Sequence, residues 1–183
     1  MFGKRTLIHP ILDEDFEAIS QVLLGALSQA QRRVRICTPY FLPDATLIAA
    51  LNTAAMRGVA VEILVPAKCN LRFVQWAAAA QADQMLVAGC RMFLTPPPFD
   101  HTKLMLVDEA WVFLGSANWD PRSSRLNFEF NVECYGESLA ERLYSATDEK
   151  CRAAEALTLA QLRKRTLPIQ LRDGVMRLFS PYL

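Results

Sequence analysis

Residues 100–131 read DHTKLMLVDEAWVFLGSANWDPRSSRLNFEFN, and the rest of the chain is best interpreted outward from this stretch. The apolar run Leu104–Val107 predicts a short strand. Because side chains alternate across a strand, His101 and Lys103, two positions apart, are expected to share a face. Asp108 has the opposite parity and is expected to point elsewhere. The three residues follow the spacing His-x-Lys-x4-Asp around one strand.

Two further strands are predicted downstream. The first, residues 111–115, leads into the motif Gly-Ser-x-Asn at residues 115–118. There a glycine lets the backbone approach an anion closely, and Asn118 can donate an amide hydrogen bond. Residues 127–135 alternate cleanly between two faces. One face is apolar (Phe128, Phe130, Val132, Cys134) and the other is polar (Asn127, Glu129, Asn131, Glu133).

The pairing of an imidazole with a fixed ammonium suits attack on a phosphodiester. The histidine acts as nucleophile or as acid, and the lysine holds the phosphate oxygens. A single histidine before a strand, or a single lysine or asparagine, is usually a solvated surface residue. It is the common spacing of His101, Lys103 and Asn118 that indicates a site.

The spacing resembles the signature of the phospholipase D superfamily, a His-Lys-Asp motif followed by Gly-Ser-x-Asn. The segments TPYFLPD (38–44), RGVAVEILVP (57–66) and GSANWDPRSSRLNFEFN (115–131) are similar to the C-terminal half of a bacterial cardiolipin synthase. The likeness extends from about Asp13 to Leu183. It implies one phospholipase D-like domain over residues 1–183, the half that carries the second motif of a two-motif protein.

The resemblance also implies an activity. Enzymes of this type are phosphatidyltransferases that form a phosphohistidine on phosphatidylglycerol or a related phospholipid, without a cofactor. We expect no metal site, because the predicted site has no cluster of carboxylates of the kind that holds magnesium. The alternatives are a phospholipase D-type phosphodiesterase or nuclease working as a homodimer, and a non-catalytic half-domain.

Five residues are the candidates for catalysis: His101, Lys103, Asp108, Asn118 and Glu129. Ser116, Asn118 and Lys103 are the candidates for substrate binding. For Asp108, both parity and the resemblance indicate that it braces the following turn instead of touching substrate. For Glu129, the resemblance implies a hydrogen bond to the catalytic histidine that fixes its tautomer.

Outside this stretch, predicted strands alternate with predicted helices. Strands are expected at 34–38, 59–65 and 91–94, and helices at 13–30, 44–57, 70–88 and 138–151. The order strand–helix–strand over residues 34–65 calls for a parallel crossover. We therefore expect an α/β fold, a mixed and largely parallel β-sheet flanked by helices on both faces, as in the phospholipase D-like α-β-α sandwich.

Several element ends and loops can be predicted from single residues. Residues 1–12 are expected to be a lead-in, with His9-Pro10 in an extended turn. Asp13 or Asp15 is expected to cap the first helix. Capping boxes are predicted at Ser138/Glu141 and at Thr158/Gln161. The PYFLPD loop is expected either at the active-site rim or as an aromatic plug over the core.

The chain carries one His-Lys pair, because His9 and His101 are its only histidines. The mechanism implied by the resemblance needs two histidines, one to attack phosphorus and one to protonate the leaving alcohol. Three explanations stay open. Two copies pair about a two-fold axis, the chain is a fragment of a two-motif protein, or it is a non-catalytic half that pairs with a partner. The chain most resembles an excised C-terminal domain.

Composition narrows the partners. The 183 residues carry a net charge of +1, which argues against a nucleic-acid partner. The five cysteines form no CxxC pair and fit neither a disulfide framework nor a zinc site. No stretch approaches the roughly 18 apolar residues of a membrane span, so any membrane contact is expected to be peripheral. The resemblance places it at the cytoplasmic side of the inner membrane, with a phospholipid as substrate.

The C-terminal tail is basic and amphipathic. Its basic residues (Arg163, Lys164, Arg165, Arg172, Arg177) lie beside apolar ones (Met176, Leu178, Phe179, Tyr182, Leu183). Such a tail can lie on anionic lipid. The simpler interpretation, which we favour, docks the apolar residues on the body of the domain and leaves the basic ones solvated.

Overall fold

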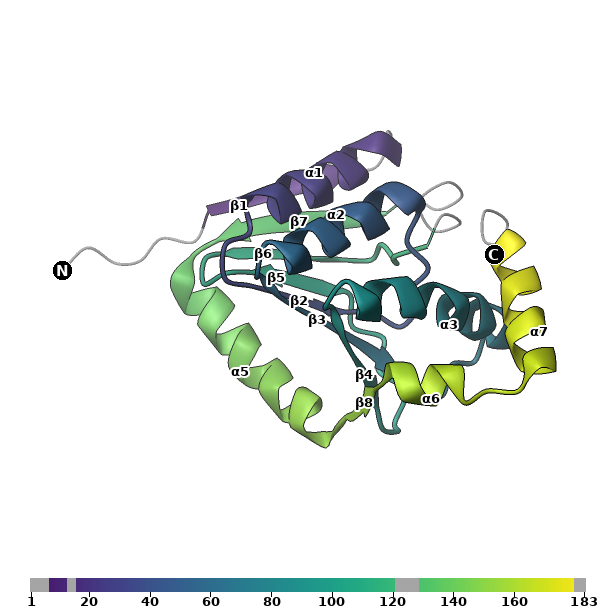
Figure 1. Cartoon of the computed structure of the whole chain (residues 1–183). Helices are drawn as coiled ribbons and strands as arrows, with labels where there is room; N and C mark the ends of the chain where they lie inside the picture. Colours follow the sequence, from purple (N-terminus) through teal and green to yellow (C-terminus); the bar gives the residue numbers. More distant parts are fainter. Residues whose placement is uncertain (1–6, 13–15, 121–128, 180–183) are drawn as a thin grey trace.

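A computed structural model of the chain describes residues 7–12, 16–120 and 129–179. Within these residues, eight strands form one sheet in the order β1-β7-β6-β5-β2-β3-β4-β8 (Figure 1). The strands are β1 (Leu7–Leu12), β2 (Arg33–Cys37), β3 (Ala60–Pro66), β4 (Arg91–Thr95), β5 (Leu104–Val107), β6 (Trp111–Gly115), β7 (Phe130–Tyr135) and β8 (Glu155–Leu157). The helices are α1 (Phe16–Gln29), α2 (Ala45–Met56), α3 (Arg72–Val87), α5 (Glu137–Ala153), α6 (Leu159–Arg163) and α7 (Leu167–Leu178).

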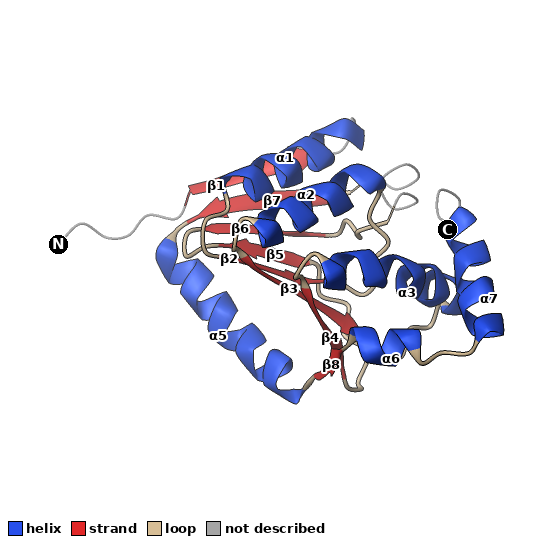
Figure 2. Cartoon of the chain, in the orientation of Figure 1, coloured by secondary structure: helices blue, strands red, loops and turns tan. Residues whose placement is uncertain are grey.

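Helices cover both faces of this sheet (Figure 2). On one face, α1, α2 and α3 pack on strand residues that include Val34, Ile63 and Met105. On the other face, α5 packs with Ala140 and Tyr144 against residues that include Leu64 and Leu106. Alternate residues of one strand thus feed two separate cores, as the pleat requires. The predicted mixed sheet flanked by helices on both faces is confirmed.

The expectation of a largely parallel sheet is wrong. Only the pairs β2–β3 and β3–β4 are parallel, and the predicted parallel crossover through α2 is one of these two. All other pairs in the sheet are antiparallel. A parallel pair needs a long crossover, usually a helix, whereas β5 and β6 are joined by residues 108–110 alone and therefore must reverse direction.

Most helix boundaries follow the predicted signals. In α1 the described members of the expected apolar stripe, Ile19, Leu23 and Leu27, are buried. Asp44 caps α2 by accepting a hydrogen bond from the Leu47 backbone at 2.8 Å. Gly58, directly beyond this helix, has a φ of +93°, which glycine adopts without strain.

The two predicted capping boxes had different outcomes. The box at Thr158 and Gln161 is present at the start of α6. The box at Ser138 and Glu141 is wrong, because α5 already begins at Glu137 behind Gly136, so that Ser138 lies inside the first turn. Asp13 and Asp15, the predicted caps of α1, lie outside the described residues.

The lead-in was predicted incorrectly. Residues 7–12 form β1, which pairs antiparallel with β7, and His9 and Pro10 lie within the strand. Proline cannot donate to a ladder, but β1 is an edge strand, where such a residue is tolerated. The three-residue strand β8 at the opposite edge was not predicted either.

The tail docks only in part. Met176 of α7 packs beside the buried residues Leu42, Val74 and Ala77. Leu178 is 76% exposed and Phe179 is also exposed, so the expectation that the apolar tail residues dock on the body fails for these two. Tyr182 and Leu183 lie outside the described residues. Within the described part of the chain, no helix combines the length and apolarity that crossing a membrane requires.

Candidate active site

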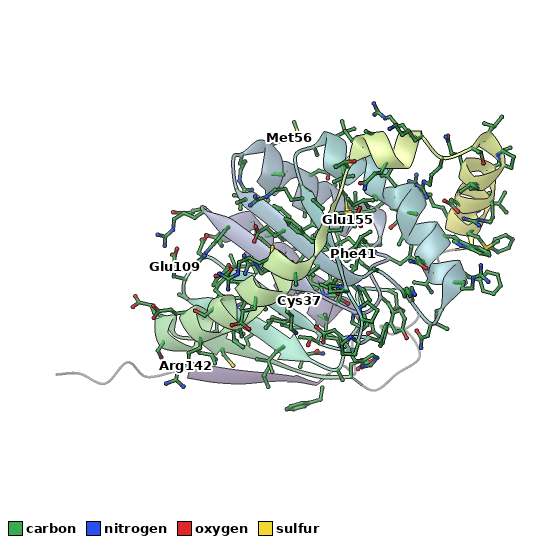
Figure 3. The ribbon with its side chains drawn as sticks, turned by 90° about the horizontal axis from the view of Figure 1, so that it is seen from below. Cys37, Phe41, Met56, Glu109, Arg142 and Glu155 are labelled. Atoms are coloured by element: carbon green, nitrogen blue, oxygen red, sulfur yellow. The ribbon has the colours of Figure 1, made fainter. Side chains whose placement is uncertain are left out.

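The predicted site residues gather where several strands end. His101 and Lys103 directly precede β5, whose first residue Leu104 pairs with Cys37 at the end of β2. Ser116 and Asn118 follow the end of β6, and Glu129 directly precedes β7. Because β5 runs antiparallel to both β2 and β6, its start lies beside the ends of those two strands. In Figure 3, Cys37 and Phe41 mark this region near the middle of the molecule.

His101 and Lys103 are in direct contact. The Lys103 Nζ atom lies 2.9 Å from His101 Nδ1 and also donates to the His101 carbonyl oxygen at 3.2 Å. Burial lowers the pKa of the Lys103 ammonium, although the nearby charges of Glu129, Asp120 and Asp100 act in the opposite direction. The His101 side chain is exposed. An ammonium in contact with an accessible imidazole suits the binding of a phosphate and attack on it.

Two aromatic rings lie beside the imidazole. The ring centroids of Tyr40 and Phe99 lie 6.2 and 6.0 Å from that of His101. The next residue, Phe41, is buried and its ring lies 6.0 Å from that of Trp119. Both interpretations of the PYFLPD loop therefore hold, since Tyr40 lies at the site and Phe41 in the core.

A charged contact from α5 holds the segment before His101. Lys150 donates to Asp100 Oδ2 at 2.6 Å, and the other oxygen of Asp100 accepts from the Thr102 hydroxyl at 2.6 Å. Partial burial raises the pKa of the Asp100 carboxyl, but the hydrogen bonds from Lys150 and Thr102 outweigh it, so this pKa lies below the ordinary value. Asp100 and Lys150 were not predicted, because fifty residues separate them and no local pattern joins them.

The turn after β6 is held by β7. Asn131 is fully buried, and its Oδ1 accepts from the Ala117 backbone at 3.2 Å. A Cβ on Gly115 would lie 2.3 Å from that oxygen, so the turn requires glycine. The Phe130 backbone donates to the Ser116 hydroxyl at 2.9 Å. Ser116 thus fastens the turn that carries Asn118, and the substrate-binding roles of these two residues remain predictions.

Asp108 lies at the opposite end of β5 from His101. Its carboxylate accepts hydrogen bonds from the backbone N–H groups of Gln31, Arg32 and Arg33 at 2.8–3.1 Å. Burial alone would raise the pKa of this carboxyl, but these bonds lower it. The expected brace is therefore present. The predicted location of its partners was wrong, because the N–H donors lie at the start of β2 and not in the turn that follows Asp108.

Glu129 is buried at the start of β7, and its charge acts to raise the pKa of Lys103. A hydrogen bond between Glu129 and the catalytic histidine stays a prediction. Within residues 7–12, 16–120 and 129–179, no three histidine, cysteine or carboxylate side chains form a group that could hold a metal ion.

The fold and the site together are those of a phospholipase D-like domain. Solved structures of other proteins share this fold. The phospholipase D family member Nuc from Salmonella typhimurium matches with a TM-score of 0.73 and 21% identity, over 84% of this chain and 99% of that chain. The phosphatidylserine synthase of Haemophilus influenzae matches with a TM-score of 0.77 and 19% identity, over 98% of this chain and 48% of that chain.

The sequence matches narrow the class. Residues 23–149 match the family described as cardiolipin synthase, PLD-like domain, and the chain belongs to this family. It is 36% identical over 171 residues to the major cardiolipin synthase ClsA of Bacillus subtilis, and equally to a cardiolipin synthase of Staphylococcus aureus. These matches cover 93% of this chain and 36% and 35% of the relatives, so the chain spans about a third of their length.

Proposed function

We propose that this chain forms one half of the active site of a phosphatidyltransferase of the cardiolipin synthase type. The observation that carries the proposal is the contact between Lys103 and His101, 2.9 Å apart at the exposed end of β5, in a member of this family. The identity to cardiolipin synthases extends over 93% of the chain and gives the proposal its substrate, phosphatidylglycerol or a related phospholipid.

We propose that the reaction has two steps. In the first, a histidine ring nitrogen attacks phosphorus, the phosphorus–oxygen bond to the headgroup glycerol breaks, and a second histidine gives its proton to that oxygen. In the second, the second histidine takes the proton of an acceptor hydroxyl, whose oxygen attacks phosphorus and breaks the phosphorus–nitrogen bond. Lys103 neutralises the phosphate oxygens, and Asn118 is proposed to donate to them.

The second histidine must come from outside the site described above, because His101 supplies one imidazole. A second phospholipase D-like half would provide it, either as another copy of this chain or as a domain of a longer protein. With phosphatidylglycerol as both donor and acceptor, the products are cardiolipin and glycerol. We place the protein peripherally at the cytoplasmic side of the inner membrane and assign it neither cofactor nor metal.

Turnover of phosphatidylglycerol vesicles tests the proposal. The chain is expected to release free glycerol and cardiolipin in equal amounts, either alone, if two copies pair, or when it is joined to a second phospholipase D-like half. The same yield is expected in the presence of EDTA. Phosphatidic acid as the only lipid product would show hydrolysis in place of transfer, and loss of activity in EDTA that one divalent ion restores would contradict the assignment of no metal.

One observation favours a second candidate, a phosphodiesterase or nuclease acting as a homodimer. The match covers 99% of the Nuc chain, so in that phospholipase D family member one domain of this kind makes up nearly the whole solved chain. Cleavage of DNA by His101-containing protein, with no action on any phospholipid, would support this candidate. Trapping no phosphohistidine under any condition would instead support a non-catalytic half-domain.

A further inference from the structure

A cavity of about 340 Å³ opens beside the candidate site, between α3, α6 and the ends of β3 and β4. Its wall is almost entirely apolar and includes Tyr40, Val65, Ala78, Met92, Leu94 and Leu162. Cavities of this size and character are typical sites for apolar ligands. The mechanism proposed above gives none of these residues a role.

The polar side chains in the wall already have partners. Gln75 donates to the Ala67 carbonyl at 2.9 Å, and Gln161 donates to Glu155 at 2.7 Å. Arg165 donates to the buried carboxylate of Asp173 at 2.6 Å. A polar guest such as a peptide or a sugar would therefore find few groups to satisfy its own hydrogen bonds, and burying them unsatisfied is costly. The wall suits a hydrocarbon.

Tyr40 connects this cavity with the imidazole. Its ring forms part of the cavity wall and also contacts His101 edge-on, with centroids 6.2 Å apart. Its hydroxyl donates to Asn70 at 2.7 Å, which fixes the ring in place. If a ligand places its phosphate at His101 and Lys103, the groups attached to that phosphate therefore lie close to the cavity, with Tyr40 between the two.

We propose that this cavity receives an acyl chain of the phospholipid whose phosphate lies at His101 and Lys103. The inference rests on the proposed function and adds to it the part of the substrate that the cavity recognises. It also separates an enzyme that acts on phospholipids from a nuclease, because a nucleic-acid substrate has no hydrocarbon chain to place there.

Binding of soluble short-chain lipids tests the inference without any need for turnover. The probes are glycerophosphoglycerol, which has no chain, and lysophosphatidylglycerols with butyryl, hexanoyl and octanoyl chains, measured by calorimetry below micelle formation. We expect the dissociation constant to fall by about fourfold for each methylene that enters the cavity. An octanoyl probe that binds no tighter than glycerophosphoglycerol would overturn the inference.

Ala78→Phe fills the cavity, and Ala49→Phe is its matched control at an exposed position of α2. We expect Ala78→Phe to remove the dependence on chain length while leaving glycerophosphoglycerol binding unchanged, and Ala49→Phe to behave as the original chain. An equal chain-length dependence in both variants would overturn the inference. If cardiolipin is nevertheless formed, the proposed function survives that result.

A measurement on the unaltered chain covers the case in which Ala78→Phe does not fold. With carbon-13 in the methionine methyl groups, the octanoyl probe is expected to shift the signal of Met92, which lies in the wall, and not that of the exposed Met56. Glycerophosphoglycerol should shift neither. A Met92 signal that the octanoyl probe leaves in place would contradict the inference. Failure of every phospholipid to be turned over, with the Met92 shift present, would instead refute only the proposed function.

Discussion

His101 has an exposed side chain at one end of β5, whereas Asp108 at the other end holds three backbone N–H groups. The two ends of one short strand therefore serve different purposes. Removing the imidazole opens no cavity in the core, but removing the carboxylate leaves the start of β2 without its acceptor. The motif residues should accordingly separate into those that affect turnover and those that affect folding.

The first prediction concerns His101→Ala and Lys103→Met, assayed with the second half present. His101→Ala is expected to abolish turnover, and Lys103→Met to lower it by roughly 100- to 1,000-fold, because a charged donor to the phosphate is lost. His101→Ala should keep the melting temperature of the original chain, since substitutions of exposed residues usually change stability by no more than about 0.5 kcal/mol. Lys103→Met should keep it too, because the unbranched methionine side chain fills most of the same half-buried space. A large fall in melting temperature in either variant would show that the pair also supports the fold.

The second prediction concerns Asp108→Asn. The amide keeps one acceptor and tolerates the φ of +50° at this position, but it loses the charge, so we expect a loss of about 1–2 kcal/mol in the free energy of unfolding. Urea denaturation measures it. The lowered pKa of Asp108 sets the pH dependence, because the ionised form is favoured in the fold.

The sign of that dependence is definite. Stabilisation by a carboxylate with a lowered pKa is present above its unfolded pKa of about 3.9 and is lost as the pH falls through its folded pKa. The difference in stability between Asp108→Asn and the original chain should therefore shrink as the pH is lowered below about 3.9. A difference that stays constant into acid would mean that the charge contributes nothing.

At the scale of elements, buried polar contacts tie β2 and β3 to α5. Arg35 is 6% exposed and Glu62 is 8% exposed, and their side chains meet at 2.6 Å. Arg35 also donates to Asp148 of α5 at 2.6 Å, and its guanidinium lies over the ring of Tyr144. These contacts lie on the face of the sheet that α5 covers, so they fix the helix that carries Lys150.

The third prediction follows from this pair. Glu62→Ala takes away one of the two carboxylates that pair with the buried guanidinium of Arg35, while Asp148 still pairs with it. We therefore expect a loss of about 1–3 kcal/mol in the free energy of unfolding. The double variant Arg35→Met/Glu62→Leu should recover much of that loss, because it removes both charges and fills the space with apolar atoms. If the double variant is as unstable as the single one, the loss would come from packing and not from the missing partner of the Arg35 guanidinium.

The fourth prediction concerns Lys150, which positions the segment before His101 through Asp100. Lys150→Met should lower kcat by roughly tenfold and leave KM nearly unchanged, because misplacing a reacting group weakens the transition state more than substrate binding. Lys150→Arg retains a charged donor and is expected to restore most of kcat. If Lys150→Met also lowers the melting temperature strongly, and Lys150→Arg does not restore kcat, then Lys150 has a purely structural role.

Elements with a periodic apolar pattern and a local end signal could be predicted from the sequence. The helix from Ala45 to Met56 has both Asp44 and Gly58 at its ends. The edge strand β1 could not be predicted, because Pro10 indicates a turn and only the pairing of residues 7–12 with β7 makes this segment a strand. The mistaken capping box at Ser138 has a similar cause, since Gly136 and the strand before it decide where α5 begins.

At the scale of the whole molecule, contacts between distant segments complete the site. The spacing around β5 predicted that His101 and Lys103 lie together, which their contact confirms. The burial of Asn131 against the Gly115 turn and the contact of Lys150 with Asp100 depend on how β7 and α5 lie on the sheet. No local pattern encodes such contacts, which is why the sequence predicted that His101 and Lys103 lie together but missed the residues that hold the neighbouring segments in place.

The last prediction concerns the number of histidines in one complete site. The reaction proposed above needs two, and this chain spans about a third of the length of its curated relatives. If two copies form the site, mixing equal amounts of the original chain and His101→Ala at constant total concentration yields about a quarter of pairs with both histidines. Turnover should then fall to about a quarter of that of the original chain at the same total concentration.

The two chains must be unfolded and refolded together so that they exchange, and Ala49→Phe in place of His101→Ala serves as the control with no expected loss. A fall to one half would show that each chain works independently of its partner's histidine. No turnover by the chain alone, together with turnover when a distinct phospholipase D-like half is supplied, would place the second histidine in a different sequence.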